Sequence, residues 1–270
     1  MSYATMQNVN FPKIGGNKHR FTPLYEPRDF FGSKKIVFKG STPKKVIFIY
    51  SRRINRIFAR HLGYRRDPKF NKLFNTLGFS MSAMLENVLL VKLPIGGPLT
   101  AATADELIAI GIKEFLIMGD AGSLSAATPP ASLVLCTKAV RDEGSSHHYI
   151  RNSKFARPSL SLTRELELSM KRKHIPFSKG PSWTIDAAYM ETKEELEKYS
   201  NEGVLTVEME AASLFAVAER RHASAAALFS VSDILKPDGW TGFVYEKNLA
   251  RITYPKFVEV AKLFGALKIA

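Results

Sequence analysis

The sequence predicts an α/β protein in which helices cover a mostly parallel sheet. Residues 45–50 (KVIFIY) and 225–231 (AAALFSV) are almost continuously apolar, which is typical of strands buried on both faces. Residues 211–218 place apolar side chains at the i, i+3, i+4 and i+7 spacing of an amphipathic helix. Because strands and helices alternate and no linker separates them, we expect one domain built on a parallel sheet.

Length and composition indicate one large globular domain. The 270 residues suit a domain at residues 41–270 after an N-terminal arm at residues 1–40, in which we expect a short strand at residues 35–39. The apolar fraction of 45% and charged fraction of 24% are ordinary for a soluble protein. No apolar run of about 18 residues predicts a membrane span, and no signal-peptide core is present. The single cysteine, Cys136, suits a reducing compartment, so we expect a cytoplasmic protein.

The charge is high and unevenly distributed. The chain carries a net charge of +14, and residues 34–72 hold thirteen Lys or Arg against one acid, Asp67. Such a region attracts phosphate, phosphorylated ligands or nucleic acid. We favour a basic surface on an ordinary enzyme. No aromatic and basic RNA-binding signature accompanies it, so nucleic acid is the less favoured partner, although the basic region leaves it open.

The remaining elements follow from periodicity and from Gly and Pro positions. The expected helices are 53–61, 100–110, 160–174, 191–199 and 248–267, the last with a break near residue 255. The expected further strands are 87–93, 114–118, 132–137 and 181–188. The expected loops are 119–124 (GDAGSL), 141–158 and 236–241 (KPDGWT).

Three carboxylates stand where an α/β sheet places its ligand site. Glu208 and Glu210 precede the helix at residues 211–221, and Asp233 follows the strand at residues 225–231. Ligands of open α/β sheets bind at the carboxyl ends of strands, so chemistry is expected at Asp233. The structural alternatives are a carboxylate favoured by the helix dipole for Glu210 and a capping or turn residue for Asp233.

Six motifs occur in one order from about residue 45 to the C-terminus: IGGP, GDAGSL, VRDEGSSHHY, TIDAAY, VEMEAASLFAVA and VSDIL. Together they resemble the nucleoside phosphorylase family of the uridine phosphorylase and hexameric purine nucleoside phosphorylase type. The resemblance implies a three-layer α/β/α sandwich with a partly barrel-like central sheet. It also implies cleavage of a nucleoside N-glycosidic bond, with phosphate as co-substrate attacking the anomeric carbon and with no cofactor.

The resemblance assigns roles to the residues of these motifs. Glu210 would accept hydrogen bonds from ribose hydroxyls, with Met209 and Glu208 beside the sugar. Asp233 would protonate the leaving base, and partial burial beside other carboxylates would help it to hold that proton near neutral pH. The residues implied at the base are Ala121, Gly122, Ala188, Tyr189 and Val207.

The resemblance also implies a homo-oligomer, as a dimer or as a hexamer of dimers. His19, in the basic arm, would reach a neighbouring subunit's active site. No metal site is expected, because the adjacent His147 and His148 cannot share one helix face and no partner ligands recur at suitable spacing.

The phosphate region departs from the family pattern. Arg53 falls on the family's phosphate-binding arginine, but Ile49 replaces the glycine of the same turn. Ile117 replaces a second arginine, and Gly119 and Asp120 stand where the family has a Gly-Thr or Gly-Ser pair. A carboxylate next to phosphate is repulsive, whereas the hydroxyl that it replaces would donate a hydrogen bond.

Two further family features are missing. The arginine lent by the neighbouring subunit has no counterpart, and Lys72 is the nearest cation. The uracil-reading Gln and Arg positions are Thr192 and Glu194, and the base-stacking aromatic is Ala188, so uridine is a doubtful substrate.

Three functions remain open. The first is a nucleoside phosphorylase whose anion site is rebuilt from Arg52, Arg53 and Lys72. The second is a phosphate-independent nucleosidase, in which Asp120 orients or deprotonates water. The third is a non-catalytic nucleoside-binding protein with a basic partner surface. The phosphorylase is preferred because most of the motifs belong to it.

Overall fold

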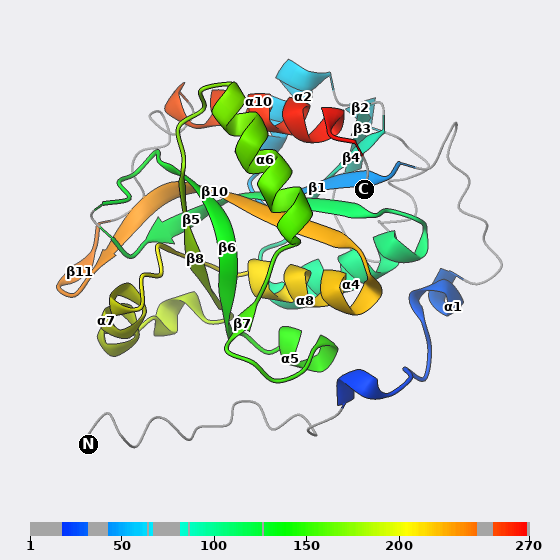
Figure 1. Cartoon of the computed structure of the whole chain (residues 1–270), viewed down its shortest axis with the longest axis horizontal. Coiled ribbons are helices and arrows are strands. Elements are labelled where there is room, and N and C mark those ends of the chain that lie inside the picture. The colour runs from blue at the N-terminus through cyan, green and yellow to red at the C-terminus, as the bar shows by residue number, and fades with distance from the viewer. Residues whose placement is uncertain are drawn as a thin grey trace.

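The computed structural model describes residues 18–31, 43–63, 65–66, 82–85, 87–125, 127–241 and 251–268. Figure 1 shows a central sheet with helices on both of its faces. Within the described ranges, no helix is long and apolar enough to cross a membrane. The strand expected at residues 35–39 and Lys72 lie outside these ranges.

The elements alternate between strand and helix along most of the chain. The strands are β1 Lys45–Ile49, β2 Arg65–Arg66, β3 Ser82–Leu85, β4 Val88–Lys92, β5 Glu114–Ser123, β6 Leu133–Asp142, β7 Phe155–Ala156, β8 Ser178–Ile185, β9 Thr206–Glu208, β10 Ser224–Lys236 and β11 Gly239–Trp240. The helices are α1 Pro27–Phe31, α2 Arg52–Leu62, α4 Gly97–Ala109, α5 Ser146–Tyr149, α6 Leu160–Arg172, α7 Lys193–Asn201, α8 Ala211–Arg221 and α10 Tyr254–Ala266, with the 3-10 turns η2 Lys18–Arg20 and η3 Ala188–Met190.

One sheet contains the eleven strands of the described residues, and part of it closes on itself. Strand β5 pairs with β10 and β9, β9 pairs with β8, β8 with β6, and β6 with β10. Strands β1, β4, β3 and β2 extend outward from β5. The two longest pairings, β5 with β10 and β6 with β8, are parallel. The predicted mostly parallel, partly barrel-like sheet is therefore confirmed.

Three apolar clusters lie among the described residues, and the two largest fill the spaces between the sheet and the helices on its two faces. On one face, Phe58 of α2, Leu166 of α6 and Phe257 of α10 are fully buried. On the other face, Leu107 of α4 and Phe215 of α8 pack together. Each such side chain stabilises the fold by about 1.5–3 kcal/mol through burial. Figure 1 shows the same division of helices, and the three-layer α/β/α prediction is confirmed.

Helix α2 begins directly after β1 because Ser51 caps it. The Ser51 hydroxyl accepts the backbone N–H groups of Arg53 at 3.2 Å and Ile54 at 3.5 Å. The helix ends at Gly63, whose φ of 68° is a left-handed conformation that glycine adopts without strain. This cap places Arg53 at the carboxyl end of β1.

Several expected loops are strands. The GDAGSL segment is the second half of β5 rather than a turn after it. Strand β10 continues through a bulge between Val231 and Asp233 to Lys236, so Asp233 lies within the strand and the prediction of a position past its end is wrong. The KPDGWT segment forms a hairpin in which β11 pairs with the end of β10. Residues 251 and 252 are helical, Thr253 interrupts the helix, and α10 begins at Tyr254 with Pro255 in its first turn, so the break expected near residue 255 is confirmed.

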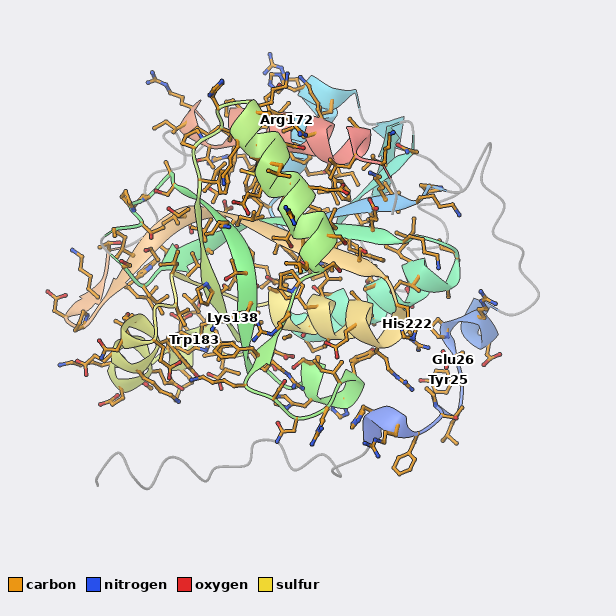
Figure 2. All side chains as sticks on the ribbon, viewed as in Figure 1. Tyr25, Glu26, Lys138, Arg172, Trp183 and His222 are labelled. Carbon is orange, nitrogen blue, oxygen red and sulfur yellow. The ribbon has the colours of Figure 1, made fainter. Side chains whose placement is uncertain are left out.

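The described part of the N-terminal arm packs on its own chain. Glu26 forms an ion pair of 2.7 Å with Arg221 at the end of α8, and Figure 2 shows Glu26 close to His222 there. Lys18 Nζ lies 2.7 Å from His148 Nδ1 on α5. The boundary between arm and domain at residue 40 stays a prediction.

Candidate active site

A cavity of about 300 Å³ opens at the carboxyl ends of β1, β5, β9 and β10. This edge of the sheet is where an α/β fold binds ligands, and the volume suits a small molecule. The structure brings nine of the predicted site residues to its wall: Asp120, Ala121, Gly122, Ala188, Val207, Glu208, Met209, Glu210 and Asp233.

Four predicted residues do not line the cavity. Gly119 lies on β5 against the ring of Tyr50, and the charge of Arg53 opposes the rise in the pKa of Asp120. Tyr189 is fully exposed on η3, and its base-binding role stays a prediction. His19 is half-buried on η2.

Glu208 is the carboxylate that holds the start of α8. Its Oε2 accepts the backbone N–H groups of Glu210 at 2.8 Å and Ala211 at 2.7 Å, and its Oε1 accepts the Thr184 hydroxyl at 2.5 Å. Burial raises the pKa of Glu208, and these hydrogen bonds oppose the rise. The helix-start role considered for Glu210 therefore belongs to Glu208.

Glu210 faces the cavity with both carboxylate oxygens held by the backbone, and its Oε2 accepts the Met209 N–H at 3.3 Å. Its Oε1 accepts the Gly96 N–H at 2.7 Å, which joins the IGGP turn to the VEMEAA motif. Gly96 has a φ of 124°, a conformation that side chains rarely adopt, so this turn requires glycine. Burial, and then the charge of Glu208, raise the pKa of Glu210 to about 8.

Asp233 is buried on the bulge of β10, opposite Gly122 of β5. Its Oδ1 lies 2.5 Å from the Ser232 hydroxyl, and its Oδ2 accepts the indole N–H of Trp240 at 2.8 Å. A Cβ atom at position 122 would stand 3.1 Å from Oδ2 and 2.8 Å from Leu235 Cδ1. Glycine there allows the two strands to bring Asp233 to the cavity wall.

Asp120 of β5 pairs with Ser230, on the other side of the β10 bulge from Asp233, and lies next to the start of α2. Burial raises its pKa to about 7; the hydrogen bond from the Tyr254 hydroxyl and the charge of Arg53 oppose the rise, and Asp233 adds to it. Ser51 also hydrogen-bonds with Tyr254. Asp120 Oδ1 is buried with no hydrogen-bond partner among the residues that the structure describes. The sequence placed Asp120 at the nucleophile position, but it gave no sign of Tyr254.

Glu191 is a wall residue that sequence reasoning missed. Burial, then Asp233 and Glu195, raise its pKa to about 7. The capping box of Thr192 and Glu195 starts α7 at Lys193 and leaves Glu191 outside the helix. This T-x-x-E pattern is readable in the sequence and would have moved Glu191 from a helix to a loop.

The cavity is acidic although the chain is basic. Five carboxylates line it, and none of its described lining residues is Lys, Arg or His. In the part of the chain that the structure describes, no group of three acidic, His or Cys side chains is arranged to hold a metal ion. His147 and His148 lie apart from the cavity wall, and the Nε2 of His147 is 3.2 Å from the Arg141 carbonyl.

The fold and the cavity define an α/β protein with an acidic small-molecule site at its strand ends. The chain belongs to the phosphorylase superfamily, whose model matches residues 70–253. This match confirms the resemblance to the nucleoside phosphorylase family.

Curated relatives carry names from the same family. A guanosine phosphorylase of Halorubrum lacusprofundi is 32% identical over 51% of this chain and 57% of its own length. A purine nucleoside phosphorylase of Myxococcus xanthus is 28% identical over 69% of this chain and 77% of its own. A uridine phosphorylase of Haemophilus influenzae is 28% identical over 45% of this chain and 54% of its own. The chain thus spans little more than half the length of two of these relatives.

Two solved structures share the fold. An AMP nucleosidase of Bacteroides thetaiotaomicron has a TM-score of 0.66 at 20% identity, covering 83% of this chain and 88% of its own. The P. knowlesi homolog of P. falciparum PNP has a TM-score of 0.66 at 22% identity, covering 84% of this chain and 91% of its own. At these identities the likeness concerns the fold.

Proposed function

We propose that this protein cleaves the N-glycosidic bond of a nucleoside and transfers the pentose to phosphate. The observation that carries the proposal is that Glu210 and Asp233, from motifs far apart in the sequence, line one cavity. Glu210 would hold the ribose, and Asp233 would protonate the leaving base. The names of the curated phosphorylases support the same reaction class.

At the sugar end, Glu210 supplies hydrogen-bond acceptors in a fixed orientation. The Gly96 N–H binds Oε1 and the Met209 N–H binds Oε2, which leaves one lone pair on each oxygen for ribose hydroxyls. Hydroxyl donors favour the ionised form, so ribose binding would lower the pKa of Glu210 from its value of about 8. The apolar side chain of Met209 lines the cavity beside it.

At the base end, the wall favours a purine with N–H donors over uracil. Glu191 supplies a carboxylate acceptor beside the apolar Val207 and Leu235. Thr192, at a uracil-reading position, is instead occupied in capping α7. We therefore propose a purine nucleoside such as guanosine or inosine as substrate.

The acidic wall also favours a nucleoside over a nucleotide. Each pair of like charges 4–8 Å apart costs about 2–4 kcal/mol at an effective dielectric constant of 20. A 5′-phosphate would meet carboxylates on several sides of the cavity with no lysine, arginine or histidine among its described lining residues.

The nucleophile would bind where Asp120 meets Arg53 and Tyr254. Ile49 and Ile117 are fully buried in the apolar core and contribute nothing to an anion site. With a pKa of about 7, Asp120 is partly neutral at neutral pH and can then donate an O–H to phosphate. The raised pKa of Asp120 thus restores the hydrogen-bond donor that a Ser or Thr hydroxyl would provide at this position.

Hydrolysis is the second candidate, because Asp120 Oδ1 is buried and lacks a partner among the described residues. An ionised Asp120 could orient or deprotonate a water molecule there. The two candidates require opposite protonation states of the same carboxyl group.

The test is base release from a panel of purine and pyrimidine nucleosides, with and without phosphate. Release that requires phosphate and yields pentose 1-phosphate supports the phosphorylase. Release that ignores phosphate supports the nucleosidase. Binding without any release would show a non-catalytic nucleoside-binding protein. Nucleoside 5′-monophosphates serve as the comparison that tests whether the acidic cavity wall favours nucleosides over nucleotides.

We further propose a cytoplasmic homo-oligomer, as a dimer or as a hexamer of dimers, in which His19 approaches a neighbour's cavity. The position of His19 on a turn packed against α5 supports only its placement at the surface of the fold. Light scattering of the purified protein measures the oligomer, and His19→Ala tests whether that residue affects base release.

A further inference from the structure

Two tryptophans make the same hydrogen bond in different surroundings. Trp183 Nε1 donates to Asp142 Oδ2 at 2.8 Å, and Trp240 Nε1 donates to Asp233 Oδ2 at 2.8 Å. Trp183 is fully buried against Tyr199, and Figure 2 shows it in the interior near α7. Trp240 is 57% exposed on the β10–β11 hairpin beside the cavity. Packing accounts for the first tryptophan but not for the second.

The hairpin itself fixes the position of Trp240. Leu235 pairs with Trp240, and the Thr241 hydroxyl accepts the backbone N–H of Ile234 at 3.0 Å. Gly239 makes the tight turn possible because its φ of 144° is unfavourable for other residues. Strand pairing therefore places the Trp240 indole within hydrogen-bonding distance of the Asp233 carboxyl group.

This contact decides where Asp233 can carry a proton. An indole N–H is a donor only, so Oδ2 must act as an acceptor. A proton on Asp233 therefore occupies Oδ1, which lies 2.5 Å from the Ser232 hydroxyl. While Asp233 is protonated, the Ser232 hydroxyl can donate to the Ala121 carbonyl at 3.3 Å, which leaves the proton on Oδ1 for the base.

We propose that Trp240 is a positioning residue that keeps the proton of Asp233 on Oδ1, from which it is delivered to the leaving base. The inference rests on the proposed function. As the glycosidic C–N bond breaks, its electron pair goes to the base nitrogen, which takes the proton from Oδ1. Phosphate or water forms the new bond to the anomeric carbon. The resulting carboxylate keeps the Trp240 N–H and gains the Ser232 O–H, which turns from Ala121.

The test compares Trp240→Phe with the unchanged protein on two ribosides. One is the best nucleoside of the panel, whose base needs a proton to leave. The other is 4-nitrophenyl ribofuranoside, whose leaving group departs as a stable anion. We expect kcat for the nucleoside to fall about tenfold, part of the roughly 10²–10⁴-fold that a general acid supplies, with KM little changed. The nitrophenyl riboside should react at the original rate.

Trp183→Phe is the matched control, because it removes the same type of bond away from the cavity. It should leave the ratio of the two rates unchanged; if it does not fold, Asp142→Asn takes its place. In the unchanged protein, nucleoside binding should alter tryptophan fluorescence, and Trp240→Phe should abolish that change.

Three outcomes overturn the inference. Equal slowing of both ribosides in Trp240→Phe would show a merely structural role, and an unchanged nucleoside rate would show no role. If the unchanged protein cleaves neither riboside, the proposed function itself fails, and the inference falls with it. A loss confined to the nucleoside supports it.

Discussion

The two ends of the cavity are built in different ways. At the sugar end, the carboxylates of Glu208 and Glu210 are held by backbone N–H groups of α8 and of the Gly96 turn. At the anion end, Asp120 accepts a hydrogen bond from the Tyr254 hydroxyl and is influenced by the charge of Arg53, and its Oδ1 has no hydrogen-bond partner among the described residues. Carboxyl groups at both ends titrate near neutral pH, but backbone donors fix the geometry of the sugar end, whereas a side chain supplies the hydrogen bond to Asp120 at the anion end.

This difference shows which part of an active site a family motif specifies. The VEMEAA motif brings its own helix start, and the Gly96 turn and Thr184 of β8 complete the sugar end. The anion end combines three separate segments, β1–α2, β5 and α10. A substitution in any one of these segments, such as Asp120 in place of the family's Thr or Ser, changes the chemistry of the anion site while the fold persists.

The largest expected effect is at the sugar end. Glu210→Gln keeps the shape of the side chain but removes the charge that strengthens hydrogen bonds from ribose. Each charge-assisted bond contributes about 1.5–3 kcal/mol, so kcat/KM should fall by roughly a hundredfold or more. Steady-state base release measures this loss.

Glu208→Gln is the control for that prediction. Because Glu208 holds the start of α8, its loss should lower the free energy of unfolding by about 1–3 kcal/mol, with a much smaller change in kcat/KM. Urea denaturation measures the first quantity. If Glu208→Gln reduces activity as much as Glu210→Gln, the division of roles between the two carboxylates is wrong.

The next effect concerns the pH dependence of the anion end. If neutral Asp120 donates to phosphate, phosphate-dependent release should fall as pH rises through about 7, the pKa of Asp120. Hydrolysis assisted by ionised Asp120 would instead rise over the same range. Phosphate itself titrates near neutral pH, so Asp120→Asn is the control. Any part of the profile that survives in this variant belongs to phosphate or to another group.

A smaller effect is expected on stability. The pKa values of Asp120 and Glu210 are raised to about 7 and 8, so the folded state binds protons that the unfolded state has already released. Their contribution to the free energy of unfolding should therefore decline as pH rises from the ordinary carboxyl range to about 8. Each group adds a slope of at most about 1.4 kcal/mol per pH unit.

Denaturation at several pH values in this window tests the decline, with Glu210→Gln and Asp120→Asn as comparisons. Each substitution should flatten the dependence. A stability that rises across the window by the same amount in all three proteins would show that other groups dominate it.

The smallest effect is expected at Tyr189. Its side chain is fully exposed while its neighbour Ala188 lines the cavity. Tyr189→Ala should leave kcat/KM within about twofold of the unchanged protein, as is usual for surface substitutions. A large rise in KM would return Tyr189 to the base-binding role suggested by the sequence, through a movement of η3 or a neighbouring subunit.

The layers and most elements could be predicted from periodicity, but the ends of the strands could not. The extension of β10 to Lys236 depends on its pairing with β11 and on the Val231 bulge, which are tertiary features. The VEMEAA and VSDIL motifs identified Glu210 and Asp233 as site residues, because each lies in a distinctive local sequence. These motifs could not identify Tyr254 and Trp240, because each reaches the site from another part of the fold.

The central claim is that this cavity cleaves a nucleoside with Glu210 holding its ribose. The most direct measurement follows inosine and guanosine by NMR in phosphate buffer, with the unchanged protein and with Glu210→Gln. The account predicts free base and pentose 1-phosphate from the unchanged protein and a loss of roughly a hundredfold or more in the variant. Bound nucleoside that stays intact with the unchanged protein, or equal turnover by both proteins, would contradict it.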